Sequence, residues 1–427
     1  MKEANFLEKL LDGERVEWKR LGEVCELSNT GVDKKINDNE QTVTLLNYVD
    51  VFRNNYIDNS IPKMQVTASD KKIKDCTALY GDIFITPSSE KIDEIGIASV
   101  IMEDLTNTCY SYHIMRLRLK EKNFITSCFI RYCFESDVLR SQILKNATGL
   151  TRFGLTKGRF ESLQIPLPPI DVQREIVRIL DNFTELTAEL TAELTAELTA
   201  RKKQYAYYRD QLLTFAEGEV EWKSLKEVIY SLKTGLNPRQ NFQLNTEDAK
   251  GYYVTVREIK NGKITFFEKT DRVNEKALIL INGRSNLDAG DVLFSGTGSV
   301  GRTAVINEKP KNWNIKEGVY TIKPIKDRIL PRYLSHLLNS SNTVKEYTKK
   351  IVGNPVVSLP MSDLRNLRIP IPSLTEQARI VSFLDKFDAL TNSITEGLPR
   401  EIKLRQQQYE YYRNLLLNFP KNEGVVE

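Results

Sequence analysis

The chain has 427 residues, of which 41% are hydrophobic and 28% are charged, and its formal net charge is +4. This length predicts two globular domains plus helices rather than one core, in a protein of ordinary soluble composition. The mild charge permits nucleic-acid binding through local basic patches but does not by itself argue for it.

The sequence argues against a membrane-spanning protein and against a disulfide-stabilised protein. No apolar run reaches the ~18–20 residues of a membrane span, and Met1–Asn5 begin no signal peptide. The five cysteines are odd in number and lack a CxxC pair, which is typical of free thiols in a reducing compartment. We therefore expect a cytoplasmic protein with no membrane partner.

Residues 1–170 are predicted to form a first mixed α/β domain. Short β-like runs cover residues 44–51, 81–85 and 97–101, between clusters of Gly, Asn and Asp. A helix is expected near Ser127–Leu144. Prolines at 166, 168 and 169 stop the domain.

Residues 171–215 are predicted to form a long spacer helix. The tetrapeptide TAEL occurs three times, at 187–190, 191–194 and 195–198, and no Gly or Pro interrupts the segment. About 45 residues at ~1.5 Å each give a rod on the order of 65 Å. Its apolar stripe contains Leu186, Leu190, Leu194 and Leu198.

The second half of the chain repeats the first. Residues 201–209 read RKKQYAYYR and residues 405–413 read RQQQYEYYR, which is a shift of 204 residues. The same shift superposes Val16–Lys19 on Val220–Lys223 and Ile165–Pro168 on Ile369–Pro372. Such a repeat predicts a second domain at residues 216–374, with a helix at Pro331–Ile351 as the counterpart of Ser127–Leu144.

A second spacer helix is predicted at residues 375–419, followed by a tail at 420–427. Gly397-Leu398-Pro399 is expected to break it near 397–399. Neither helix could bury its apolar stripe alone, so the two are expected to pack against each other antiparallel. The expected fold class is α+β: two mixed α/β domains in tandem, each followed by a long helix, with the helices packed as an antiparallel coiled coil.

The repeated Gln-Tyr-x-Tyr-Tyr-Arg motif places Tyr205 and Tyr208 on one helix face, and Tyr409 and Tyr412 on the other. Aromatic rings beside Arg could stack on bases. The TAEL segment, however, is acidic and would repel phosphates. We therefore interpret these tyrosines as protein contacts, within the chain or to a partner, and assign them with the leucine stripe to the spacer and partner-docking surface.

Residues 296–301 match GxGxxG, but the following Arg302–Ile306 reads as a strand, whereas a dinucleotide site needs a helix there. A tight turn that brings backbone close to a ligand is the better interpretation. If that ligand is DNA, four side chains are well placed for phosphate or base-edge contacts: Ser295, Thr297, Ser299 and Arg302. The first copy has Ser88, Ser89 and Lys91 at the comparable place.

Catalytic motifs are not convincing anywhere. The two histidines, His113 and His336, have no ligand cluster beside them in the sequence, and no GxxxxGK[ST] loop occurs. Asn354-Pro355-Val356-Val357 lacks the second proline and the aromatic residue of the amino-methyltransferase motif. We expect no catalytic residues, no metal and no cofactor bound by this chain.

Basic residues beside Gly-, Asn- and Ser-rich turns are the remaining candidates for a DNA contact, although each could also be an ordinary surface charge. In the first half they are Lys34, Lys35, Arg152, Lys157 and Arg159. In the second half they are Arg239, Arg284 and Arg302.

Together, the doubled Val-Glu-Trp-Lys, the doubled Ile-Pro-x-Pro and the TAEL tandem resemble the specificity subunit of type I restriction-modification enzymes, and the tandem resembles the type IC branch. The likeness is carried by residues 10–25, 165–223 and 369–419, and the segment 387–402 resembles the same branch. The resemblance implies that each globular half is a target-recognition domain for one half of a split, asymmetric sequence in double-stranded DNA.

The resemblance also implies partners: two methyltransferase subunits docked on the helices, and motor-nuclease subunits. S-adenosylmethionine, ATP and Mg are then implied for those partners, and this chain is a non-catalytic subunit. Two alternatives stay open. One is a coiled-coil protein scaffold without DNA reading, which would not need two large, divergent halves rich in polar turns. The other is a DNA-modifying enzyme in its own right, which would need a catalytic motif.

Overall fold

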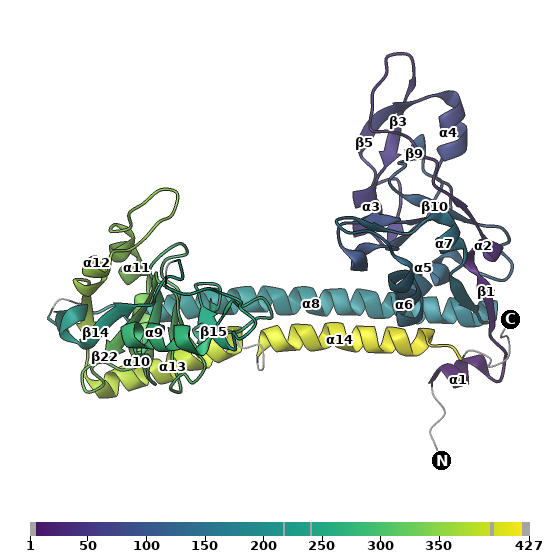
Figure 1. Ribbon diagram of the computed structural model, residues 1–427. Helices are drawn as coiled ribbons and strands as arrows, with labels where there is room; N and C mark the ends of the chain where they lie inside the picture. Colours follow the sequence, from purple (N-terminus) through teal and green to yellow (C-terminus); the bar gives the residue numbers. More distant parts are fainter. Residues whose placement is uncertain (1–5, 217, 240, 393–396, 421–427) are drawn as a thin grey trace. The chain divides into compact units, whose positions relative to one another are not determined.

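The computed structural model describes residues 6–216, 218–239, 241–392 and 397–420. Its contacts divide the chain into two compact units, the first drawn from Met1–Leu190 and Arg405–Glu427 and the second from Thr191–Leu404. Each unit therefore contains one globular domain and parts of the long helices, which Figure 1 labels α8, α13 and α14. Of the predicted tail at 420–427, only Pro420 lies among the described residues.

The globular part of the first unit is a mixed α/β domain (Figure 1). Its main sheet has five strands in the order β2-β10-β6-β8-β4, and a second sheet has the order β5-β3-β9. The elements are α1 (Phe6–Leu11), β1 (Glu17–Arg20), α2 (Leu21–Val24), β2 (Cys25–Ser28), β3 (Gln41–Leu46), α3 (Tyr48–Arg53), β4 (Tyr56–Ile57), β5 (Met64–Ala68), α4 (Asp70–Cys76), β6 (Ile83–Ile85), β7 (Ser88–Ser89), η1 (Ile92–Glu94), β8 (Ala98–Ile101), β9 (Thr108–Tyr110), β10 (Met115–Leu119), α5 (Ser127–Glu135), α6 (Asp137–Asn146), β11 (Phe153–Gly154), α7 (Lys157–Glu161) and β12 (Gln164–Leu167).

The globular part of the second unit repeats this plan with a smaller main sheet. A four-stranded sheet has the order β14-β22-β19-β20, and a three-stranded sheet has the order β18-β15-β21. The elements are β13 (Glu221–Ser224), η2 (Leu225–Glu227), β14 (Ile229–Thr234), β15 (Gly251–Val254), β16 (Ile259–Lys260), β17 (Lys263–Ile264), β18 (Arg272–Val273), α9 (Glu275–Ser285), β19 (Val292–Ser295), β20 (Thr303–Val305), β21 (Trp313–Ile315), β22 (Val319–Pro324), α10 (Pro331–Leu338), α11 (Ser341–Thr348), α12 (Met361–Arg365) and β23 (Arg368–Ile371).

The repeated sequence motifs form one strand pair in each unit. β1 pairs antiparallel with β12, so that Trp18 lies opposite Pro166, and β13 pairs with β23, so that Trp222 lies opposite Pro370. Val-Glu-Trp-Lys and Ile-Pro-x-Pro therefore form the two paired strands of one two-stranded antiparallel ribbon in each unit. The ribbon closes each domain, because the chain enters along one strand and leaves along the other.

The ribbon leads into a long helix in both units. α8 covers Ile170–Leu212 without interruption, and α13 covers Leu374–Asn392. One buried glutamine anchors the start of each. The side-chain amide of Gln173 donates to the carbonyl oxygens of Phe124 and Pro168, both at 2.8 Å. The side-chain amide of Gln377, its counterpart in the second copy, donates in the same way to Arg328 and Pro372 at 2.9 Å. Because buried polar groups need partners, this bond set fixes the angle at which the helix leaves the domain.

The antiparallel packing of the two helices is confirmed inside each unit. In the first unit, Phe183 of α8 contacts Tyr412 of α14 (Leu398–Leu417), with ring centroids 5.7 Å apart. The hydroxyls of Thr184 and Tyr409 lie 3.0 Å apart. In the second unit, Tyr208 of α8 packs between Phe383 and Phe387 of α13, at 5.5 and 5.7 Å. Each globular domain thus holds the start of its own helix together with the end of the other one.

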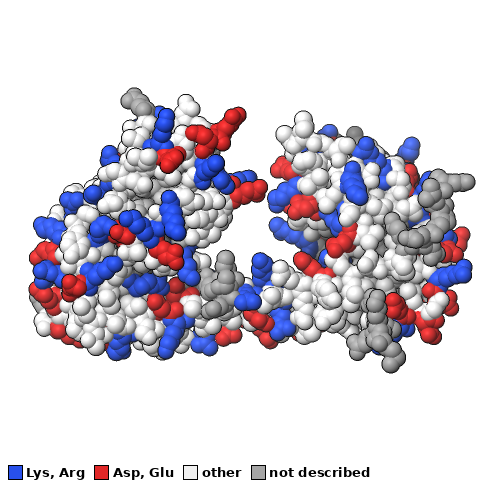
Figure 2. Space-filling view, turned by 60° about the horizontal axis from the view of Figure 1, so that its bottom comes forward, with Lys and Arg blue, Asp and Glu red and all other residues white. Residues whose placement is uncertain are grey.

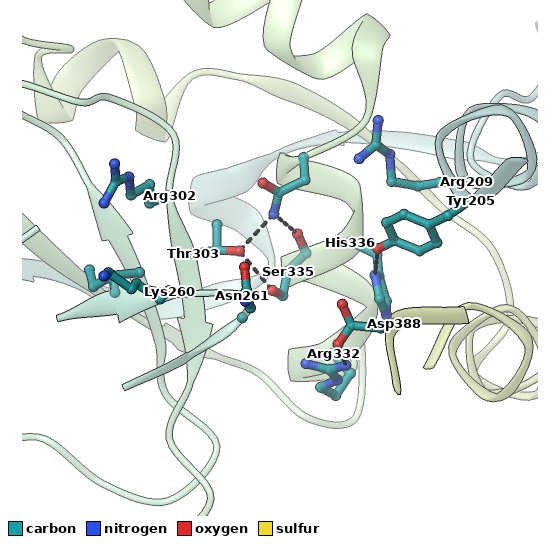
Figure 3. A pocket seen from close by; sticks show the side chains of 13 residues that line it. Tyr205, Arg209, Lys260, Asn261, Arg302, Thr303, Arg332, Ser335, His336 and Asp388 are labelled. Carbon is teal, nitrogen blue, oxygen red and sulfur yellow. Dashed lines mark hydrogen bonds and ion pairs between the residues drawn. The ribbon is translucent and has the colours of Figure 1, made fainter. Parts of the chain in front are cut away.

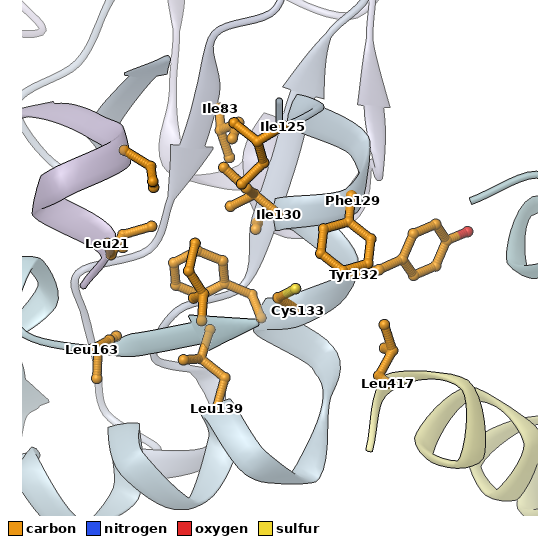
Figure 4. Close-up of a cluster of buried hydrophobic side chains, with 14 of the residues drawn as sticks. Leu21, Ile83, Ile125, Phe129, Ile130, Tyr132, Cys133, Leu139, Leu163 and Leu417 are labelled. Atoms are coloured by element: carbon orange, nitrogen blue, oxygen red, sulfur yellow. The ribbon is translucent and has the colours of Figure 1, made fainter. Parts of the chain in front are cut away.

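The core of the first unit joins the sheet, α5 and the long helices. Figure 4 shows Phe129, Ile130 and Cys133 of α5 at its centre, with Leu417 of α14 at its edge. Burial of a large apolar side chain contributes about 1.5–3 kcal/mol. Both long helices are therefore held to this domain by the hydrophobic effect.

Two expectations from the sequence need correction: the extent of one helix in each domain and the extent of one strand. The helix expected near Ser127–Leu144 is two helices, α5 and α6, and its counterpart at Pro331–Ile351 is α10 and α11. The chain is extended at Ser136 and at Ser340, and both serine hydroxyls donate to the carbonyl three residues earlier, at 2.7 and 2.8 Å. A short polar side chain that bonds nearby backbone competes with the helical hydrogen bonds and ends the first helix of each pair.

The β-like run at residues 44–51 is a strand only as far as Leu46, where β3 ends. Asn47 then caps α3, because its side chain accepts from the backbone N–H of Val49 at 2.8 Å and the carboxylate of Asp50 accepts from the N–H of Asn47 at 2.9 Å. This reciprocal capping outweighs the strand preference of Val49 and Val51.

The second spacer is interrupted near the break predicted at 397–399, and it forms two helices, α13 and α14. Gly397, between α13 and α14, has a φ of +77°, which a helix does not accommodate, and Pro399 lies in the first turn of α14, where a missing N–H costs nothing. Residues 393–396, between them, lie outside the described residues.

Candidate nucleic-acid interface

The GxGxxG segment at 296–301 is the turn of a β-hairpin. β19 and β20 pair antiparallel with Phe294 opposite Thr303, so a strand and not a helix follows the glycines. Gly301 has a φ of +101°, and a Cβ there would lie 2.3 Å from the Tyr347 hydroxyl. The glycines therefore serve a tight backbone turn, and the prediction of a turn in place of a dinucleotide loop is confirmed.

The side chains of this turn have two different roles. Ser295 is fully buried; its hydroxyl donates to the carbonyl of Ser299 at 2.5 Å and accepts from the N–H of Arg302 at 2.8 Å. The hydrogen-bonding capacity of the Ser295 side chain is therefore used to close the turn, which argues against its predicted contact with DNA. Ser299 and Arg302 are exposed, Thr297 is half-buried, and these three stay predicted contacts.

The comparable turn of the first unit contains β7. Ser89 is buried and its hydroxyl donates to the carboxylate of Glu94 at 2.6 Å, while Lys91 forms an ion pair with the same carboxylate at 2.9 Å. Ser89 thus stabilises the turn as Ser295 does in the second unit, which argues against its predicted contact with DNA as well. Lys91 remains exposed. Ser88 accepts a hydrogen bond from the Nε of Arg152 at 3.2 Å.

A second hairpin lies against each of these turns. In the first unit, β11 pairs with β7, so that Gly154 lies opposite Ser88. In the second unit, Ser358 forms an isolated bridge with Thr297. Gly154 and Ser358 occupy equivalent positions in the two copies, so the pairing is a repeated feature. Arg152 belongs to the hairpin of the first unit. The hairpin of the second unit contains residues 354–357, which the sequence analysis considered only as an incomplete methyltransferase motif.

Lys34 and Arg152 lie near enough to His113 for their charges to act on its imidazole. Burial lowers the pKa of His113 first, and the positive charges of Lys34 and Arg152 lower it further. Lys35, beside them, forms an ion pair with Asp33 at 2.9 Å. A neutral imidazole among cations can donate to or accept from a base edge or a phosphate. His113, which is distant from Lys34 in the sequence, is therefore a candidate that sequence reasoning missed.

The remaining predicted cations are not part of this group. Lys157 lies 3.6 Å from Glu161 within α7, and Arg159 donates to the carbonyl of Asn146. Arg239 lies in the loop after β14, and Arg284 lies in the last turn of α9. All four are exposed and stay predictions.

On the face shown in Figure 2, basic and acidic side chains are interspersed over the surface of both units. This agrees with the small net charge. DNA binding would therefore rest on local clusters such as the one around His113.

The helix tyrosines take part in contacts inside the units. Tyr205 hydrogen-bonds the Nδ1 of His336 at 3.1 Å, and the Nε2 of His336 lies 2.7 Å from the carboxylate of Asp385. Arg332 pairs with the same carboxylate at 2.6 Å. Burial alone would raise the pKa of Asp385, but the hydrogen bonds from His336 and Arg332 outweigh it and hold the pKa below its ordinary value.

The first unit has an equivalent polar junction. Asp181, the counterpart of Asp385, accepts hydrogen bonds from the hydroxyls of Tyr132 at 2.7 Å and Tyr56 at 2.5 Å. Burial, together with the bond to Asp181, raises the pKa of Tyr56 well above its usual range. Tyr409 and Tyr412 contact Thr184 and Phe183, as described above. All four tyrosines predicted for docking are thus placed against their own chain.

The leucine stripe of α8 is only partly covered. Leu186 is 51% exposed, whereas Leu190, Leu194 and Leu198 are half-buried. A single exposed apolar residue is ordinary on a protein surface, so docking of a partner at this stripe stays a prediction.

Within the described ranges, no three His, Cys, Asp or Glu side chains come close enough to hold a metal ion. No helix among those residues is long and apolar enough to cross a membrane.

Comparison with known proteins identifies the family. The model of the type I restriction modification DNA specificity domain matches this chain twice, at residues 14–200 and 217–404. The chain belongs to the type I restriction-modification DNA specificity family. It is 34% identical to the type I restriction enzyme EcoR124I/EcoR124II specificity subunit of Escherichia coli, with 100% of both chains covered. It is 32% identical to a putative type I restriction enzyme specificity subunit of Haemophilus influenzae, which covers 97% of this chain and 98% of that one.

Two solved structures share the fold of this specificity-family chain. One comes from a study of complex assembly and conformational transition of the type I restriction-modification system, with a TM-score of 0.64, 19% identity and coverage of 95% and 97%. The other is the HsdS subunit from Thermoanaerobacter tengcongensis, with a TM-score of 0.51, 19% identity and coverage of 95% and 96%. At this identity the likeness supports the arrangement of elements alone.

Arg302 is the cation of the turn at 295–302 whose loss is expected to have the clearest effect. Its Nη1 donates to the carbonyl oxygen of Val256 at 3.1 Å, which positions the guanidinium without neutralising it. Arg302→Ala should weaken DNA binding by about 1–3 kcal/mol if Arg302 contacts a base and by less if it contacts phosphate. Affinity titrations at several salt concentrations measure both quantities.

Arg302→Lys is the matched variant, because it retains the charge but loses the bidentate donor pair. A phosphate contact predicts near-normal binding for this variant, whereas a base contact predicts a loss close to that of alanine. Unchanged affinity and unchanged salt dependence in Arg302→Ala would mean that the side chain only faces solvent.

Proposed function

We propose that this chain is the sequence-specific DNA-recognition subunit of a type I restriction-modification complex. Each globular domain reads one half of a bipartite, asymmetric target, and the helices dock two methyltransferase subunits, to which motor-nuclease subunits attach. The observation that carries the proposal is that the DNA specificity domain matches the chain twice, once in each unit. The protein works in the cytoplasm, where its DNA and its partners are.

Catalysis belongs to the partners in this proposal. S-adenosylmethionine, ATP and Mg are used by the methyltransferase and motor-nuclease subunits, and this chain supplies only recognition and spacing. The three TAEL copies support placement in the type IC branch. The predicted boundaries between domains and helices, at 170/171, 215/216 and 374/375, belong to the same proposal.

The test is methylation with and without partners. Purified chain is expected to methylate no DNA alone, whereas co-expression with its methyltransferase should methylate one bipartite sequence throughout the host genome. Single-molecule methylation mapping measures both. Methylation or cleavage by the chain alone would mean that it is an enzyme, and a methyltransferase complex that forms but modifies no defined sequence would favour a protein scaffold.

A further inference from the structure

The second unit contains a polar pocket of about 480 Å³ where the globular domain meets the long helices. Figure 3 shows Lys260 and Arg302 coming from the strand side, Tyr205 and Arg209 from α8, and His336 from α10. Four of the side chains that line the pocket are cationic, and one, Asp388, is a carboxylate. The pocket therefore has a positive electrostatic character.

Two of these cations have no carboxylate partner among the described residues. The ammonium of Lys260 lies over the ring of Phe267 at 4.4 Å, and Arg302 bonds only to the backbone carbonyl of Val256. The other two are engaged: Arg332 with Asp385, and Arg209 with Asp210 at 3.3 Å. The charge available to a ligand is therefore concentrated on Lys260 and Arg302.

The first unit shows what fills the equivalent space there. The shift of 204 residues superposes Ser335 of the pocket on Arg131. Arg131 is 1% exposed, and its guanidinium lies 4.4 Å from the ring centre of Tyr132, the counterpart of the pocket residue His336. It also forms an ion pair with Glu135, whose counterpart, Asn339, lines the pocket as well. The first unit thus fills the space with its own ion pair, and the second unit leaves it open.

The open space in the second unit is polar and held in shape. The hydroxyls of Thr303 and Ser335 lie 2.9 Å apart, and the amide of Asn339 donates to the hydroxyl of Thr303 at 2.6 Å. A lysine and an arginine without carboxylate partners among the residues that line such a pocket match an oxyanion, since Arg and Lys side chains are common phosphate ligands in proteins. Arg302 also ends the turn at 295–302, so the pocket adjoins the predicted DNA contacts.

We propose that this pocket binds a phosphate group. The inference rests on the proposed function for its ligand source: a backbone phosphate of the DNA that the second unit reads. A soluble phosphate compound has the same chemistry and is the other source. The first unit has no such site because Arg131 and Glu135 occupy the equivalent space. The two halves therefore differ in their contacts with the DNA backbone at the equivalent positions.

The decisive variant, called the plug variant, introduces the Arg131–Glu135 ion pair of the first unit at the equivalent positions of the second unit. Ser335→Arg with Asn339→Glu adds one positive and one negative charge, so it fills the pocket without changing the net charge. In the complex with the methyltransferase partner, the slope of log affinity for target DNA against log salt should become less steep by about 0.9, the value for one phosphate contact. Inorganic phosphate, compared with sodium chloride at equal ionic strength, should raise the unfolding temperature of the wild-type chain and leave that of the variant unchanged.

Lys260→Gln gives an independent test, since it removes one free cation without adding bulk, and it should reduce the slope in the same way. Lys276→Gln is its control, because Lys276 is an exposed residue of α9 that does not line the pocket. Equal effects of the two lysine variants would overturn the proposal, because overall charge would then explain them.

The outcomes separate the ligand sources. Loss of both the phosphate effect and part of the salt slope assigns the site to a DNA phosphate, and loss of the phosphate effect alone assigns it to a soluble phosphate compound. No change in either measurement, for both the plug variant and Lys260→Gln, overturns the inference. Failure of the wild-type complex to bind its target at all would instead contradict the proposed function.

Discussion

Deleting Thr195–Leu198 from α8 is expected to shorten the unread gap between the two half-sites by one base pair and to leave both half-sites unchanged. α8 is continuous from Ile170 to Leu212, so four residues fewer remove about 6 Å of rise and about 400° of turn, a net rotation of about 40°. One base pair of B-DNA turns by about 34–36° and rises by about 3.4 Å.

The net rotation of the helix by four residues therefore corresponds to one base pair of DNA, whereas the rise of the helix by four residues corresponds to nearly two base pairs. Orientation is the stricter requirement, because a domain turned away from its groove cannot read base edges, whereas a small tilt of the helix absorbs the extra length. Methylation mapping of the deletion variant measures the gap directly.

A length-preserving control separates spacing from side-chain effects. Replacing Thr195 and Leu198 with alanine retains the length of the helix and should leave the gap as it is, since alanine is a strong helix former. A fourth TAEL copy should lengthen the gap by one base pair. An unchanged gap in the deletion variant, or altered bases in either half-site, would refute the idea that α8 sets the spacing.

Exchanging residues 20–164 for the equivalent stretch of another family member is expected to change one half of the target completely and to leave the other half intact. The structure supports these cut points, because Arg20 and Gln164 lie directly opposite each other at the end of the β1–β12 ribbon. The exchanged piece therefore enters and leaves at one place, and the other three residue pairs of the ribbon and the helix anchor Gln173 stay in the host chain. Methylation mapping of the chimera identifies the new half-site.

The second unit supplies the matched control. Residues 224–368 are the same stretch in the second copy, and Ser224 lies opposite Arg368 in the β13–β23 ribbon. Their exchange should change the other half of the target. If either exchange altered both halves, the two domains would not read DNA independently, and modular recognition would be wrong.

The organisation of the chain into two domains and long helices could be predicted from the sequence alone, because the second half repeats motifs of the first at a shift of 204 residues. The repeat marks Val-Glu-Trp-Lys and Ile-Pro-x-Pro in both halves, although their pairing as strands is visible only in the structure, and the uninterrupted helix formers around TAEL predict α8. Local periodicity reports such features directly, since it needs no knowledge of what lies opposite. The turn at 296–301 was also predictable, because a strand pattern follows its glycines.

The tertiary structure alone decided which polar side chains are available for binding. Ser295 and Ser89 look like their exposed neighbours in the sequence, but each is buried and closes its own turn. Lys34, His113 and Arg152 are brought together only by the fold. The pocket lined by Lys260 is open where Ser335 replaces the Arg131 of the first unit. Whether a small side chain at this position leaves a pocket depends on the helices and strands around it. Whether a polar group meets water, a partner or a ligand is decided by long-range packing, about which the spacing of residues along the chain carries no information.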